Sequence, residues 1–120
     1  MSKYTKYLAA LAVGVTAAGS MSTVPASAKV EGDTVTLGSA VSITGRYAVN
    51  GKHTKNGYDL AVKFVNDKGG IIVGGKKYKL AIQYYDDEST AQRGTQLAER
   101  LIQQDKIKFI LGPYSSGMTK

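Results

Sequence analysis

Hydroxyl-bearing side chains fill a short loop near the end of the sequence, Gly112 to Gly117. Ser115 and Ser116 stand where the pattern indicates that a helix begins. The unpaired backbone N–H groups and the dipole at the start of a helix attract anions, so this loop can bind a carboxylate or a phosphate. The alternative is that Ser115 or Ser116 only caps the helix, which is the commoner role of a serine at such a position.

A second polar loop, Ser42 to Gly51, offers hydrogen-bonding groups and one aromatic face. Its polar side chains are Ser42, Thr44, Arg46, Tyr47 and Asn50. The stretch GKHTKNG lacks the G-x-x-x-x-G-K-[ST] spacing of a phosphate-binding loop, and no G-x-G-x-x-G follows the first strand. Taken alone, the loop is an ordinary polar connection from strand to helix. We therefore expect no nucleotide and no other cofactor.

Three consecutive carboxylates, Asp86 to Glu88, suggest a metal site or an acidic catalyst. Adjacent carboxylates point in different directions, and the sole histidine, His53, belongs to another part of the chain. We interpret this segment as a solvated turn at the end of a strand and predict no metal site. The sequence also has no cysteine, no G-x-S-x-G motif and no H-E-x-x-H motif, so we predict that it is not an enzyme.

Alternating strands and helices must position these loops. The pattern predicts strands over 34–41, 78–85 and 107–111, helices over about 52–68 and from 89 or 90 onward, and a hairpin that joins 71–73 to the second strand. This order predicts a right-handed, doubly wound α/β fold with a parallel sheet. In such a sheet, ligands bind beyond the carboxyl ends of the strands, where the three loops lie.

The first 28 residues have the three parts of a secretory signal peptide. Lys3 and Lys6 form the basic region, residues 8–18 the apolar region, and Ala26-Ser27-Ala28 the cleavage site. The alternative, a transmembrane anchor, needs about 20 apolar residues, and this run is shorter. We therefore predict cleavage before Lys29 and export to the periplasm.

Composition and charge exclude several classes of protein. The chain has 120 residues, a formal net charge of +7 and no cysteine, which excludes a disulfide scaffold. Its lysines are scattered among acidic residues and do not form a stripe with aromatic side chains between them. We therefore expect no nucleic-acid partner.

Four short motifs follow one another from Thr34 onward: TGRY in the first loop, NDKGGI after the first helix, YDDE at the end of a strand, and GPYSS after the next strand. Together they resemble the N-terminal part of bacterial leucine/isoleucine/valine-type periplasmic binding proteins. These are the substrate-binding subunits of branched-chain amino-acid ABC transporters. The resemblance implies a two-lobed fold, in which residues 29–120 form an incomplete first lobe with a doubly wound parallel sheet.

The resemblance also implies roles for individual residues. In the family, a serine at the place of Ser116 binds the α-carboxylate of the ligand, and Ser115 stands beside it. Tyr47 and Asn50 fall in the part of the first loop that lines the cleft, although one branch of the family has tyrosine at the place of Asn50. The implied partners are a small ligand, either an amino acid or a related carboxylate, and a membrane permease.

Family members are longer than this chain, so we expect it to be a truncated gene product or a piece of a longer sequence. The same lobe also occurs as the ligand-binding sensory domain of receptors, which is the alternative function. A small flavodoxin-like enzyme is disfavoured by the export signal and by the missing phosphate-binding loop.

Overall fold

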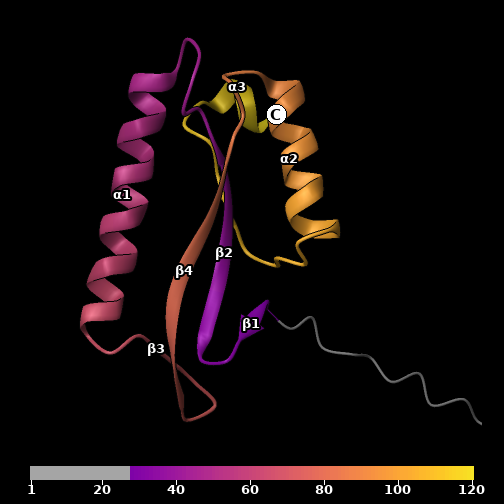
Figure 1. Ribbon diagram of the computed structural model, residues 1–120. Helices are drawn as coiled ribbons and strands as arrows, with labels where there is room; N and C mark the ends of the chain where they lie inside the picture. Colours follow the sequence, from indigo (N-terminus) through magenta and orange to yellow (C-terminus); the bar gives the residue numbers. More distant parts are fainter. Residues whose placement is uncertain (1–27) are drawn as a thin grey trace, which may run out of the picture.

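Figure 1 shows the computed structural model of the chain, which describes residues 28–120. The predicted signal peptide, residues 1–28, lies outside the described residues except for its last one. The elements follow in the order β1 (Val30–Glu31), β2 (Thr34–Val41), α1 (Ala48–Asp67), β3 (Ile71–Val73), β4 (Lys76–Asp86), α2 (Ala91–Gln103), β5 (Ile110–Leu111) and α3 (Ser116–Thr119). Within residues 28–120, no helix is both long and apolar enough to cross a membrane.

The sheet is built around β2. β4 runs parallel to β2 along its whole length, and β5 runs parallel to β2 on the other side, with Gly38 opposite Ile110. β1 pairs with the start of β2 and β3 pairs with the start of β4, both in antiparallel orientation. The sheet is therefore mixed at its amino end, because β1 and β3 run antiparallel to their neighbours.

The two long helices cover opposite faces of this sheet (Figure 1). The crossover through α1 leads from β2 to β4, and the crossover through α2 leads from β4 back past β2 to β5. The doubly wound α/β fold is thus confirmed. From β2 the chain crosses to β4 on one side and then returns to β5 on the other, so the strand order reverses between β2 and β5. Sheets of this kind bind ligands at the carboxyl ends of the strands where the order reverses.

The buried apolar residues come from β2, from α2 and from the turn after α2. Val41, Leu101 and Ile107 are completely buried, and Val35, Ala40 and Leu97 are nearly so. Ile107 was predicted to begin the last strand, but its backbone N–H donates to the carbonyl of Leu101. It therefore closes the end of α2, and the strand itself is only Ile110–Leu111.

Helix α1 begins at Ala48, earlier than the predicted start near Lys52. Gly51, which was assigned to the loop, is a buried residue of the first turn. A Cβ atom there would lie 2.0 Å from the carbonyl oxygen of Ser42. Only glycine at this position lets the first turn of α1 pack directly against Ser42 at the end of β2. Gly51, which was assigned to the loop, therefore belongs to the first turn of α1 because of this close contact.

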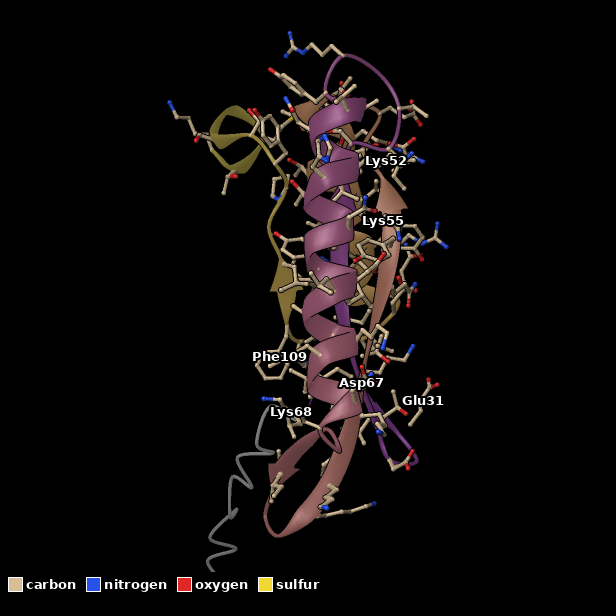
Figure 2. The ribbon with its side chains drawn as sticks, turned by 90° about the vertical axis from the view of Figure 1, so that its left-hand side faces the viewer. Glu31, Lys52, Lys55, Asp67, Lys68 and Phe109 are labelled. Carbon is tan, nitrogen blue, oxygen red and sulfur yellow. The ribbon has the colours of Figure 1, made fainter. Side chains whose placement is uncertain are left out.

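Helix α1 runs along the sheet, with Lys52 and Lys68 near its two ends (Figure 2). Close to its C-terminal end, the side chain of Asn66 bonds to both backbone groups of Leu80 in β4. Its Nδ2 donates to the Leu80 carbonyl at 2.8 Å, and its Oδ1 accepts from the Leu80 N–H at 2.8 Å. The β3–β4 hairpin follows with Gly74-Gly75 at its turn, as predicted.

Candidate functional site

Three loops meet at the carboxyl edge of the sheet, as the topology predicts. They follow β2 (residues 42–47), β4 (residues 87–90) and β5 (residues 112–115). The first and third come from the two strands at which the order reverses. Hydrogen bonds join the second loop to the first, and an aromatic contact joins the first to the third.

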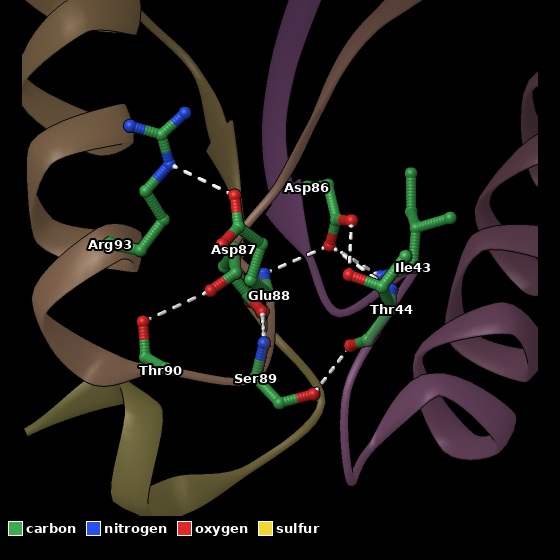
Figure 3. Close-up of polar contacts among 8 residues, drawn as sticks. All are labelled: Ile43, Thr44, Asp86, Asp87, Glu88, Ser89, Thr90 and Arg93. Carbon is green, nitrogen blue, oxygen red and sulfur yellow. Dashed lines mark hydrogen bonds and ion pairs between the residues drawn. The ribbon is translucent and has the colours of Figure 1, made fainter.

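Asp86, the last residue of β4, binds the first loop (Figure 3). Its Oδ1 accepts hydrogen bonds from the backbone N–H groups of Ile43 at 2.9 Å and Thr44 at 3.2 Å, and its Oδ2 accepts from the Thr44 hydroxyl at 2.7 Å. Burial raises the pKa of the Asp86 carboxyl, but the hydrogen bonds from Thr44, Glu88 and Ile43 outweigh burial and hold this pKa below its usual value.

Asp87 is completely buried. Its Oδ1 accepts from the Ser42 hydroxyl at 2.6 Å and from the Ser89 N–H at 2.8 Å, whereas its Oδ2 has no hydrogen-bond partner among the described residues. The interpretation of Asp86 to Glu88 as a solvated turn is therefore wrong for Asp87. This carboxylate is removed from water because it binds groups from two loops.

Ser89 connects the acidic loop to Tyr47. Its hydroxyl donates to the Thr44 carbonyl at 2.6 Å and accepts from the Tyr47 N–H at 3.0 Å. Glu88 and Ser89 both have a left-handed backbone, with φ of 53° and 61°. Such a backbone costs energy for residues other than glycine, so the surrounding hydrogen bonds must hold it in place. The sequence pattern predicted only that the second helix begins at 89 or 90, and it did not reveal these contacts of Ser89.

Two tyrosines bring the first and third loops together. The ring centroids of Tyr47 and Tyr114 are 6.0 Å apart, and the ring planes are tilted by 55°. The Arg46 guanidinium carbon lies 4.6 Å from the centre of the Tyr47 ring. The hydroxyl of Tyr58, on α1, donates to the Gly112 carbonyl at 2.9 Å and so holds the start of the third loop against the helix.

The remaining predicted site residues differ in their surroundings. Ser115 is the N-cap of α3, and its Oγ accepts from the Gly117 N–H at 3.2 Å, so a capping role for this loop is confirmed at Ser115. Ser116 is exposed in the first turn of α3. Asn50 is also exposed, but it lies in the first turn of α1 and not in the loop to which it was assigned.

An open pocket of about 600 Å³ lies beside these loops. It is lined by Arg46, Tyr47, Glu88, Ser89, Thr90, Ala91, Gln92, Gly117 and Met118. Over residues 28–120, no group of His, Cys, Asp or Glu side chains is arranged to hold a metal ion. The arrangement suits a small organic ligand, because it offers an aromatic face, a guanidinium and hydroxyl groups around one hollow.

The family described as "Periplasmic binding protein" matches residues 34–120. Among curated proteins, the chain is similar to Leu/Ile/Val-binding protein homolog 1 of Brucella abortus, with 38% identity over 85 residues. This alignment covers 71% of the chain and 22% of the relative, so the chain spans about a fifth of the length of that protein.

Solved structures show the same fold. The chain is similar to LivJ, the substrate binding protein of a branched-chain amino acid transporter from Streptococcus pneumoniae, solved in complex with isoleucine. The identity is 29% and the TM-score 0.64, and the match covers 72% of this chain and 24% of that chain. The chain is also similar to a solute binding protein of an ABC transporter from Rhodopseudomonas palustris BisB5, which was solved in complex with 3,4-dihydroxybenzoic acid. The identity is 32% and the TM-score 0.51, and the match covers 65% of this chain and 20% of that chain.

Proposed function

The chain belongs to the periplasmic binding protein family, and from that premise we propose that it binds a small carboxylate-bearing solute for uptake by an ABC transporter. The ligand is an amino acid of the branched-chain type or a related small carboxylate. The observation that carries the proposal is that the family match, residues 34–120, includes all three loops at the carboxyl edge of the sheet.

Ser116 is the residue that we propose to bind the carboxylate of the ligand. Its side chain is exposed, whereas the Ser115 hydroxyl already accepts a hydrogen bond from the Gly117 N–H. Tyr47 and Asn50 then line the cleft from the first loop and from the first turn of α1. The two solved relatives support this ligand class, because isoleucine and 3,4-dihydroxybenzoic acid both carry a carboxyl group.

The proposal also includes a place and a partner. A signal peptide over residues 1–28 would deliver the chain to the periplasm with Lys29 at its N-terminus. There the protein would pass its ligand to the membrane permease of an ABC transporter. The names of the relatives, which include binding proteins of such transporters, support this partner.

The test uses this chain joined after Lys120 to the corresponding remainder of the Brucella relative. Calorimetry with leucine is compared for the unchanged chimera, Ser116→Ala and Ser115→Ala. If Ser116 donates a hydrogen bond to a carboxylate, Ser116→Ala weakens binding by about 1.5–3 kcal/mol, roughly ten- to a hundredfold.

Ser115→Ala is the matched control. It removes the cap of α3, so it should lower stability by about 1 kcal/mol and leave the affinity of the folded protein nearly unchanged. Unchanged affinity in both variants would contradict the role of Ser116. Failure of the unchanged chimera to bind any small carboxylate would contradict the proposed function itself.

A further inference from the structure

We propose that the ligand carries an aromatic ring, which stacks on the exposed ring of Tyr114 beside Tyr47. This inference rests on the proposed function and narrows its ligand class from small carboxylates to aromatic carboxylates. It starts from the placement of the two tyrosines, which come from the loops after β2 and β5, the strands at which the strand order reverses.

The geometry of the two rings leaves aromatic surface available. Their centroid distance of 6.0 Å and tilt of 55° lie in the range of tilted aromatic pairs, in which the rings do not cover each other face to face. Tyr114 remains 48% exposed although it contacts Tyr47. Tyr114 does not itself line the pocket, but its exposed ring contacts Tyr47, which does, and is therefore suited to stack on a flat ligand there.

Hydrogen bonds hold the backbone of the two loops that carry these rings before any ligand arrives. The Ser89 hydroxyl binds the Tyr47 N–H at 3.0 Å, and Ser89 is in turn fixed by the buried carboxylate of Asp87. On the other loop, the Tyr58 hydroxyl binds the Gly112 carbonyl, two residues before Tyr114. Stacking on rings that are already ordered loses less conformational freedom than ordering them on binding.

Charge at the same place favours an anionic ligand. The guanidinium of Arg46 lies over the Tyr47 ring, and Arg46 forms no ion pair with any described residue. Glu88, the only acidic residue in the pocket lining, faces Arg93, with a separation of 3.7 Å between Arg93 Nε and Glu88 Oε1. Arg46 therefore remains available to a carboxylate.

The pocket lining offers little to a branched aliphatic side chain. None of its described residues is Val, Leu, Ile or Phe, and the apolar contributions come from Tyr47, Ala91 and Met118. An aliphatic ligand gains from being enclosed by apolar groups, whereas a ring can also gain from stacking on tyrosine. The lining that these residues form therefore favours a ring over a branched aliphatic side chain.

The test is a titration of the 120-residue chain with sodium benzoate and, separately, with leucine, followed by NMR of the tyrosine rings. We expect benzoate to shift the signals of Tyr47 and Tyr114 and to reach half-saturation at a concentration about tenfold lower than leucine. Tyr85, on β4, is the internal control, because its hydroxyl donates to Asp105 beyond the end of α2, and its signals should not move.

Two variants at one position separate stacking from packing. Tyr114→Phe keeps the ring and should bind benzoate like the unchanged chain, whereas Tyr114→Leu should weaken benzoate about tenfold, more than it weakens leucine. The amide signals of residues 87–89 report whether each variant keeps its fold. If Tyr114→Leu does not fold, the unchanged chain and Tyr114→Phe still decide the question.

The possible outcomes have distinct meanings. If leucine binds more tightly than benzoate, the aromatic class is wrong while solute binding stands. Equal loss of both ligands in Tyr114→Leu would also contradict ring selection. If neither compound shifts Tyr47 or Tyr114, the aromatic class is wrong, and the leucine calorimetry of the chimera decides separately whether the proposed function stands.

Discussion

The two ends of the β2–β4 strand pair are built in opposite ways. At the carboxyl end, the buried residues include polar ones, since Ser42, Asp87 and Ser89 are each less than 5% exposed. At the amino end, apolar side chains reach solvent, with Ile72 69% and Val73 56% exposed. An apolar pocket of about 360 Å³ lies at this end, with Val30, Val35 and Tyr78 among its lining residues.

The buried polar residues at the carboxyl end hold that end of the sheet in one geometry, whereas the amino end has no such network among the residues compared. Hydrogen bonds are directional, so the bonds of Asp86, Asp87 and Ser89 fix the course of the first loop and the backbone of Tyr47. Hydrophobic contacts are not directional, and they position the amino end less strictly. In this chain, buried polar groups distinguish the carboxyl end of the sheet, where we propose the ligand site, better than the distribution of apolar residues does.

The largest effect should follow the removal of the buried carboxylate at the carboxyl end. Asp87→Ala leaves the Ser42 hydroxyl and the Ser89 N–H without their acceptor, so we expect the free energy of unfolding to fall by ~3–5 kcal/mol. Glu31→Ala at the amino end is the control, because its exposed ion pair with Lys29 contributes less than about 1 kcal/mol. Denaturant titration measures both, and similar losses would contradict the comparison.

A smaller effect should distinguish two glycines that share a left-handed backbone. Gly45, at the carboxyl end, has φ of 81°, and a Cβ atom there would lie 2.7 Å from the Glu88 carbonyl oxygen. Gly74, at the hairpin turn, has φ of 56° and open space around it. We expect Gly45→Ala to destabilise the fold by ~2–3 kcal/mol and Gly74→Ala by ~1 kcal/mol.

The measurement is thermal unfolding of both glycine variants beside the unchanged chain. Backbone strain is common to the two substitutions, so their difference reports the crowding between the first loop and the acidic loop. An equal loss in the two variants would show that the carboxyl end is packed no more closely than the hairpin.

The smallest effect concerns pH. Because the pKa of Asp86 is lowered on folding, the unfolded chain takes up the proton first as the pH falls. The stabilisation is complete above about pH 4, the usual value for an aspartate, and is lost as the pH falls through the lower pKa of the folded state. We expect Asp86→Asn to cost ~1 kcal/mol at neutral pH and to make the loss of stability in acid less steep.

Denaturation curves between about pH 2 and pH 6 test this expectation for the unchanged chain and Asp86→Asn. The two curves of stability against pH should approach each other in acid. Parallel curves over the whole range would mean that the hydrogen bonds to Asp86 do not favour its charged form.

Much of the fold could be predicted, because it depends on local spacing. The hairpin that joins 71–73 to the second strand was predicted, and so were the two long helices between the parallel strands. The start of α1 was predicted too late, because Gly51 is a poor helix former by itself. Its place in the helix is set by the approach of Ser42, a contact that the sequence alone does not reveal.

The candidate site could be predicted in place but not in detail. The alternation of strands and helices placed the three loops at one edge, and the structure confirms this. The burial of Asp87 could not be predicted, because its partner Ser42 is 45 residues away and charged runs are usually exposed. Likewise, no local pattern paired Tyr47 with Tyr114, since their contact depends on the order of β2 and β5 in the sheet.

The side chain of Asn66 has a consequence for how copies of this chain meet. By bonding to both backbone groups of Leu80, its amide takes the place that a strand from another molecule would need at that point of β4. A strand from another molecule would have to displace both hydrogen bonds between Asn66 and Leu80 before it could pair with β4 at this edge. Strand exchange and fibril growth should therefore begin elsewhere, and β5, with Phe109 and Ile110 exposed, is the segment where we expect them.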